Sequence, residues 1–175
     1  MCRTGGCTID NFSEHTNPIF MDALILKEIR YAGVTLQVPD EWRHKTEEFR
    51  DEDGTKSYGI AVSSRGRTPR SVNISWGVMP EGTNAYTEAC ITYEQVVGEI
   101  ELAENEEAIM SFAFQEYEAH GFNAHAENGL PCFFFCVEIP SGENKILLTA
   151  LASAANIPDL EDLLDFVESH ISVQG

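Results

Sequence analysis

The dipeptide Asn128-Gly129 constrains the fold of this chain more than any other feature. Both central positions of a two-residue hairpin turn need a positive φ, which Asn and Gly tolerate better than other residues. The flanking segments 122–127 and 130–139 are rich in apolar residues, and 140–144 then turns the chain into 145–153. The sequence therefore predicts a meander of three antiparallel strands at the middle of a sheet.

The turn also predicts which residues face each other across the first hairpin. A two-residue turn pairs Glu127 with Leu130, and this pairing fixes the register of both strands. The resulting pairs are Phe122 with Phe135, Ala124 with Phe133, and His125 with Cys132. One face is then expected to carry Phe122, Ala124, Ala126, Phe133, Phe135, Val137 and Ile139.

Cys132 and Cys136 lie on the second strand of this hairpin, in a segment that is apolar on both faces. Such a strand is typical of the covered interior of a sheet. Four residues along a strand span about 13 Å, which exceeds the ~7 Å Cα limit for a disulfide. We therefore expect both cysteines to be reduced, buried thiols, as in a cytoplasmic protein.

The composition indicates one folded domain. The chain has 175 residues, of which 43% are hydrophobic and ten are Phe, enough for a substantial core. We expect residues 23–175 to form this domain. Residues 1–22 contain Gly5-Gly6 and Asn17-Pro18 without a hydrophobic period, so they predict a flexible leader. No apolar run reaches the roughly 20 residues of a membrane span.

The charge is concentrated in the second half of the chain. Residues 1–80 hold 11 acids and 10 bases, a net charge of −1, whereas residues 81–175 hold 18 acids and one base, Lys145, within the total of −18. Such a field repels nucleic acids and anionic membranes and favours a basic protein partner. The alternative is that the acidity only increases solubility.

The remaining elements are predicted from their patterns. A strand ends at Pro39, segments 46–50 and 57–64 form a hairpin around residues 51–56, and 72–79 alternates as a strand. Residues 90–102 are ambiguous, and we favour a strand over their second half. Helices are expected at 105–120, with Asn105 as N-cap and Gly121 at its end, and at 158–171. Strands with few helices indicate an α+β fold, an antiparallel sheet covered by helices.

This order of elements resembles the PsbP/DcrB-like group. The resemblance covers about residues 29–171 and lies in the Pro39-x-x-Trp42 turn, the following hairpin and helix, Asn128-Gly129-Leu130-Pro131, and the terminal amphipathic helix. It implies an α/β/α sandwich. Members of the group are mostly non-catalytic: photosystem subunits, a GTPase-binding nuclear import factor, envelope lipoproteins, and adaptor chaperones for secreted bacterial effectors. The resemblance transfers no functional residue to this chain.

Two candidate metal sites do not meet the requirements of their metals, one in the position of its ligands and one in their number. With Gly54 at position six of an EF-hand loop, Phe49 stands at position one and Ile60 at position twelve, where carboxylates are required. His125 and Cys132 supply only two ligands, and structural zinc needs four. The sequence also lacks the G-x-S-x-G, Walker A and G-x-G-x-x-G motifs. We therefore predict no catalytic residue, metal or cofactor.

Arg65, Arg67 and Arg70 form the most distinctive polar cluster, with three of the 11 bases within six residues. Guanidinium groups bind carboxylates and phosphates bidentately, so we predict these residues as candidates for partner binding. The alternatives are a solvated loop, contact with the acidic half of the same molecule, or contact with a second copy in a homodimer.

The leading hypothesis is a non-enzymatic binding or adaptor module that presents an apolar sheet or groove with an acidic rim to a basic protein. One alternative is a small hydrolase or ligand-binding enzyme with a site between sheet and helix. Another is an adaptor of the effector-chaperone type from a bacterial secretion system.

Overall fold

The computed structural model describes residues 24–97 and 108–174, so the leader predicted at 1–22 lies outside the described residues. These residues form ten strands and two helices. The strands are β1 (Leu26–Tyr31), β2 (Val34–Pro39), β3 (Arg43–Arg50), β4 (Lys56–Ser63), β5 (Arg70–Val78), β6 (Met110–Phe114), β7 (Tyr117–His125), β8 (Pro131–Ser141), β9 (Asn144–Ala154) and β10 (Ile171–Val173). The helices are α1 (Ala85–Val96) and α2 (Ile157–His170).

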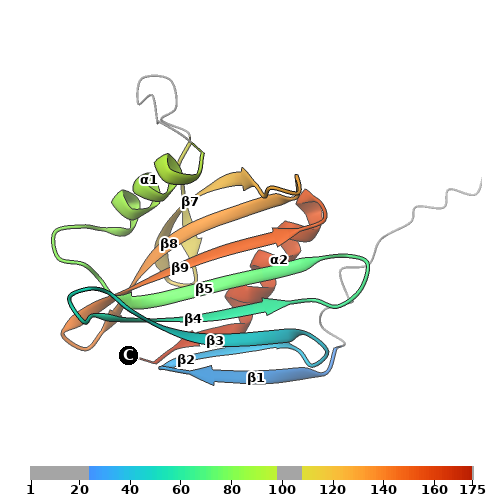
Figure 1. Cartoon of the computed structure of the whole chain (residues 1–175), viewed down its shortest axis with the longest axis horizontal. Helices are drawn as coiled ribbons and strands as arrows, with labels where there is room; N and C mark the ends of the chain where they lie inside the picture. The colour runs from blue at the N-terminus through green and yellow to red at the C-terminus, as the bar shows by residue number, and fades with distance from the viewer. Residues whose placement is uncertain (1–23, 98–107, 175) are drawn as a thin grey trace, which may run out of the picture.

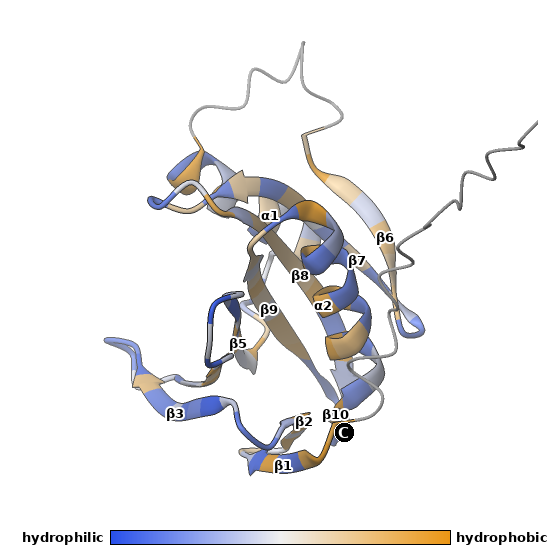
Figure 2. Cartoon of the chain, turned by 90° about the vertical axis from the view of Figure 1, so that its right-hand side faces the viewer, coloured by the Kyte–Doolittle hydropathy of each residue, from blue (hydrophilic) through white to orange (hydrophobic). Residues whose placement is uncertain are grey.

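The strands form two antiparallel sheets. The larger has seven strands in the order β3-β4-β5-β9-β8-β7-β6, and the smaller has the order β1-β2-β10. The two helices lie on opposite sides of the larger sheet (Figures 1 and 2). This arrangement confirms the predicted α+β fold and the predicted meander, which is β7-β8-β9. The hairpin expected around residues 51–56 is also present, as β3-β4.

Helix α2 covers one face of the larger sheet together with the smaller sheet. Asn156 caps the helix, because its Oδ1 accepts the backbone N–H of Asp159 at 2.9 Å. Leu160, Leu163 and Val167 are buried in the main core. This confirms the helix predicted at 158–171, whose final residue already belongs to β10. Among the described residues, no helix is both long and apolar enough to span a membrane.

Helix α1 lies on the opposite face and packs mainly on β7 and β8. Asn84 Oδ1 accepts the N–H of Thr87 at 2.9 Å, and Ala85 and Ala89 are buried against Phe122. The strand favoured over the second half of 90–102 lies mostly outside the described residues, and α1 occupies this segment as far as Val96. Two small residues one turn apart allow this helix to approach the sheet closely, and no long apolar stripe is needed.

The helix predicted at 105–120 is wrong. Residues 105–107 lie outside the described residues, and the rest forms the β6-β7 hairpin, which turns at Gln115 with φ 54°. Phe112 and Phe114 alternate with Ser111 and Ala113, which is a strand period.

Gly121, expected to end that helix, lies inside β7. A Cβ at this position would lie 2.3 Å from the Phe134 carbonyl oxygen. The glycine is needed for a close approach of two strands rather than for a helix terminus.

The register predicted for the β7-β8 hairpin is wrong by one residue. The Ala126 N–H donates to the Leu130 carbonyl at 2.9 Å, so three residues, Glu127 to Gly129, form the loop. Gly129 has φ 79°, as in a type I turn followed by a left-handed residue.

This shift changes the partners across the hairpin. Phe122 pairs with Phe134, and His125 pairs with Pro131 instead of Cys132. Because a one-residue slip exchanges the faces of a strand, Phe122 packs under α1 and not in the main core.

Candidate functional site

An apolar groove lies between α2 and the β6-β8 side of the large sheet. It has a volume of about 440 Å³. Phe112, Phe114, Phe133 and Phe135 line it from the sheet, and Leu164 lines it from α2. The ring centroids of Phe112 lie 5.6 Å from Phe133 and 5.7 Å from Phe135, within the range of favourable aromatic pairs. We refer to this site as the α2 groove.

Three carboxylates of α2 form the rim of the α2 groove. Glu161, Asp165 and Glu168 follow one another at i, i+4 and i+7, so they share one side of the helix. Glu161 and Asp165 are exposed. No Lys or Arg belongs to the described lining. Phe114, Phe133 and Phe135 form the buried floor of the groove, and half-buried Phe112 is the most accessible of the four rings. The groove therefore offers aromatic surface and negative charge to the same ligand.

Gln115 joins the β6-β7 turn to the C-terminal part of α2. Its backbone N–H donates to Glu168 Oε1 at 2.5 Å, and its Nε2 donates to the carbonyls of Glu168 at 3.0 Å and Ile171 at 2.9 Å. These bonds hold the strand that carries Phe112 and Phe114 at a fixed position beside the helix. They determine the geometry of the groove.

On the face of the large sheet opposite to α2, no described helix or strand lies over β3, β4, β5 and the adjoining part of β9. We call it the open face. Its side chains are small or polar on β4 and β5: Gly59, Ala61, Ser63, Ser71, Asn73 and Ser75. On β9, Thr149 is half-buried and Leu151 is 39% exposed.

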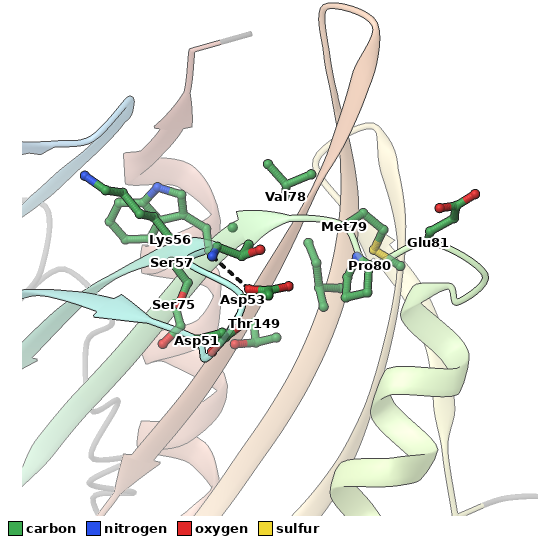
Figure 3. A pocket seen from close by; sticks show the side chains of 14 residues that line it. Asp51, Asp53, Lys56, Ser57, Ser75, Val78, Met79, Pro80, Glu81 and Thr149 are labelled. Atoms are coloured by element: carbon green, nitrogen blue, oxygen red, sulfur yellow. Dashed lines mark hydrogen bonds between the residues drawn. The ribbon is translucent and has the colours of Figure 1, made fainter.

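A hollow of about 530 Å³ lies at one end of the open face (Figure 3). Asp51 and Asp53 border it from the β3-β4 loop, and Glu81 borders it from the connection between β5 and α1. Lys56 of β4 also lines it and forms an ion pair with Glu48 at 3.3 Å. The backbone N–H of Thr55 donates to Asp53 Oδ1 at 2.8 Å and holds the pKa of Asp53 below its ordinary value. We call this site the acidic hollow.

The opposite end of the open face is basic. A hollow of about 230 Å³ is lined by Arg43, His44 and Lys45 of β3 together with β4 and β5. Lys45 forms an ion pair with Glu47 on the same strand. The β4-β5 loop follows at this end and carries Arg65 and Arg67, both exposed.

The three predicted arginines have different environments. Arg70 Nη2 donates to Asp159 Oδ1 at 3.1 Å, and both side chains are largely buried. Arg70 thus contacts the acidic half of the same molecule, one of the alternatives that the sequence left open. Arg65 and Arg67 are exposed and form no ion pair with a described residue, so they do not share the environment of Arg70.

The predicted thiol and histidine positions carry no reactive arrangement among the described residues. Burial, and secondarily the charge of Glu88, raises the pKa of Cys136 to about 12, so its thiol is neutral at physiological pH. Cys90, Cys132 and Cys136 are free. No group of three His, Cys, Asp or Glu that could hold a metal ion occurs in the described ranges.

One serine–histidine pair is present at the edge of the sheet. Ser111 Oγ lies 2.9 Å from His120 Nδ1, and the pair is exposed. His120 also borders a hollow of about 330 Å³ with Glu138 and Lys145. Lys145 Nζ donates to Glu138 Oε2 at 2.9 Å, while Glu138 Oε1 accepts the N–H of Ala85 at the start of α1. These two groups are therefore occupied in holding α1 on the sheet.

The α2 groove was not assigned from the sequence. The sequence feature that indicates it is the spacing of two residues between Phe112 and Phe114, which is the same as that between Phe133 and Phe135. Reading residues 105–120 as a helix concealed that all four rings share one face of a sheet.

Comparisons with known proteins give matches in structure only. No family model matches the chain, and no curated protein matches it in sequence. A protein of Bacteroides thetaiotaomicron matches with 13% identity, a TM-score of 0.43 and coverage of 82% of this chain but 46% of that protein. LpqN, involved in cell envelope biogenesis of Mycobacterium tuberculosis, matches with 15% identity, a TM-score of 0.42 and coverage of 89% and 95%.

Cyanobacterial PsbP from Synechocystis also matches, with 13% identity, a TM-score of 0.38 and coverage of 85% of this chain and 92% of that protein. A PsbP is thus among the matched structures, as the resemblance in the order of elements predicts. All three TM-scores lie below 0.5, so these matches carry no argument about function.

Proposed function

We propose that this protein is a non-enzymatic protein-binding module that takes an apolar segment with basic flanks into the α2 groove. The observation that supports the proposal is the combination of four Phe rings with a rim of carboxylates and no cation in the described lining. Aromatic pockets supply most of the affinity in protein interfaces, while surrounding charge selects the partner and increases the association rate.

The size of the groove fits a short segment rather than a whole domain. A volume of about 440 Å³ lies in the range of sites that enclose a few side chains. One or two apolar side chains can reach the rings of Phe112 and Phe133. Lys or Arg residues on either side then lie near Glu161 and Asp165.

The same site argues for binding in preference to catalysis. The described lining of the α2 groove contains carboxylates but no His, Cys, Ser or Lys. In the hollow at the start of α1, Glu138 and Lys145 are hydrogen-bonded to each other, and Glu138 also accepts the N–H of Ala85. The Ser111–His120 pair lies elsewhere and is exposed. A general base acts best where water is excluded and its partner is fixed.

Selection from a displayed library of random peptides tests the proposal. The wild type is expected to enrich peptides that combine aromatic or aliphatic residues with Lys or Arg. A variant with Glu161→Lys and Asp165→Lys should not enrich them, because both carboxylates are exposed and their reversal changes the rim without removing buried contacts. If the wild type enriches no such peptides, the proposal is wrong.

A further inference from the structure

The open face carries opposite charges at its two ends. Asp51, Asp53 and Glu81 border the acidic hollow. Arg43 and Lys45 line the basic hollow at the other end, and the loop with Arg65 and Arg67 follows it. A surface with this polarity is complementary to itself after a rotation of 180°.

The distance between the two ends suits such a pairing. Ser57 belongs to the acidic hollow and Ser63 to the basic hollow, so the ends lie six residues apart on β4, or about 20 Å. The residues between them on β4 and β5, such as Gly59, Ala61 and Asn73, are small or short, and the larger side chains of this face are Phe49 of β3, whose ring lies over Gly59, and Leu151 of β9. Two sheets can therefore approach to the usual spacing of about 10 Å.

We propose that a second copy of this chain docks on the open face about a twofold axis, with the 65–67 loop of each copy in the acidic hollow of the other. Guanidinium groups suit this hollow, because Asp51, Asp53 and Glu81 border it and the hydroxyls of Ser57, Ser75 and Thr149 line it. Lys56 also lines it, but its charge is paired with Glu48 at 3.3 Å. The loop has a defined shape, since Ser64 Oγ accepts the N–H of Arg70 at 2.9 Å and donates to the Thr68 carbonyl at 3.1 Å.

The charge distribution favours a second copy at this face over the faces that residues 81–175 form. Residues 1–80 are almost neutral, whereas residues 81–175 carry a net charge of −17. Two copies repel each other wherever their second halves meet. Where β9 pairs with β5 on the open face, it contributes uncharged side chains: Leu147, Thr149, Leu151 and Ser153.

The area of the open face implies a weak dimer. Four strands spaced by about 4.8 Å and about 20 Å long give a flat area of roughly 400 Å² on each copy. This lies at the low end of specific interfaces, even with the loops added. We therefore expect association that depends on protein concentration and on salt, independent of the α2 groove.

Sedimentation velocity with two charge-reversal variants tests the proposal. One variant carries Arg65→Glu and Arg67→Glu, and the other carries Asp51→Arg and Glu81→Arg. The wild type should dimerise with increasing concentration, and each variant alone should dimerise about tenfold or more weakly. An equimolar mixture of the two variants should dimerise again, because each loop then meets a hollow of opposite charge.

Two matched controls change the charge elsewhere by the same amount. Arg30→Glu with Arg50→Glu and Glu127→Arg with Glu143→Arg alter exposed residues outside the open face and its two hollows, and should leave the dimer unchanged. A wild type that stays monomeric at all concentrations would overturn the proposal. So would a mixture of the two variants that associates no better than either variant alone.

Discussion

Gln115 and Glu168 bind each other through both backbone and side chain. The Gln115 N–H donates to Glu168 Oε1, and Gln115 Nε2 donates to the Glu168 carbonyl. The two residues are 53 positions apart, and their contact fixes the β6-β7 turn against α2. The shape of the α2 groove depends on this contact.

Two substitutions of Gln115 should separate the contribution of its side-chain hydrogen bonds to the free energy of unfolding from that of its positive φ. Gln115→Ala removes the two side-chain bonds and is expected to lower the free energy of unfolding by about 1–3 kcal/mol. Gln115→Gly loses the same bonds but relieves the positive φ of 54°, so it should be more stable than the Ala variant by about 1 kcal/mol. Urea denaturation measures both values. An Ala variant as stable as the Gly variant would contradict the role of the left-handed turn.

Gly121→Ala should be severely destabilising. Its Cβ would lie 2.3 Å from the Phe134 carbonyl oxygen, and the strand backbone cannot move away without losing the β7-β8 ladder. We expect a loss of several kcal/mol, about the upper range of single substitutions, or failure to fold. Thermal unfolding measures the effect.

Gly59→Ala is the matched control for Gly121→Ala. Here the nearest atom is Cε2 of Phe49 at 3.1 Å, and that ring is 44% exposed and able to shift. This variant should stay within about 1 kcal/mol of the wild type. Equal effects of the two substitutions would show that the close approach at Gly121 does not determine the spacing of β7 and β8.

These two positions also show how far the sequence predicts the fold. Alternation of apolar residues is sufficient to identify β5, β8 and β9, and the stripe from Leu160 to Val167 is sufficient to identify α2. The sequence around Gly121 predicts a helix end wrongly, because a glycine can either end a helix or permit a close contact between two strands. Only the position of Phe134 in space distinguishes the two roles.

The register at Asn128-Gly129 could not be obtained from the turn residues alone. Asn-Gly suits a two-residue loop, but Gly129 in a three-residue loop satisfies the same requirement for positive φ. The difference of one residue moves Phe122 from the main core to the layer under α1. The α2 groove depends on this tertiary arrangement, since Phe112 and Phe133 come from strands that are not adjacent in the sheet.

The stability of the protein should depend on the ionisation of Glu138. The hydrogen bond from Lys145, followed by that from the Ala85 N–H, holds the pKa of Glu138 below its ordinary value. A lowered pKa in the folded state stabilises the protein above the unfolded-state pKa, and this contribution is lost as the pH falls through the folded-state value.

Glu138→Gln should therefore be less stable than the wild type at pH 7, and the difference should shrink as the pH falls below about 4. Urea denaturation of both proteins at pH 7 and at a pH below about 4 gives the difference in the free energy of unfolding under each condition. A difference that stays constant with pH would show that ionisation of Glu138 does not contribute to stability.

Cys136 should resist alkylation in the folded protein. With a pKa of about 12, only about one molecule in 10⁴ carries a thiolate at pH 8, and the side chain is buried. Iodoacetamide labelling followed by peptide mass spectrometry should show modification of half-buried Cys90 well before Cys136. In denaturant both should react. Rapid labelling of Cys136 under native conditions would indicate a reactive site that the structure does not contain.

The affinity of one selected peptide for the α2 groove tests the central claim most directly. The peptide most enriched on the wild type is labelled and titrated by fluorescence anisotropy. Asp162→Lys with Glu143→Lys is the matched control for Glu161→Lys with Asp165→Lys, because it changes the net charge equally at exposed residues outside the groove. We predict about tenfold weaker binding for the groove variant and unchanged affinity for the control. Equal affinities of wild type and groove variant would contradict binding at the α2 groove.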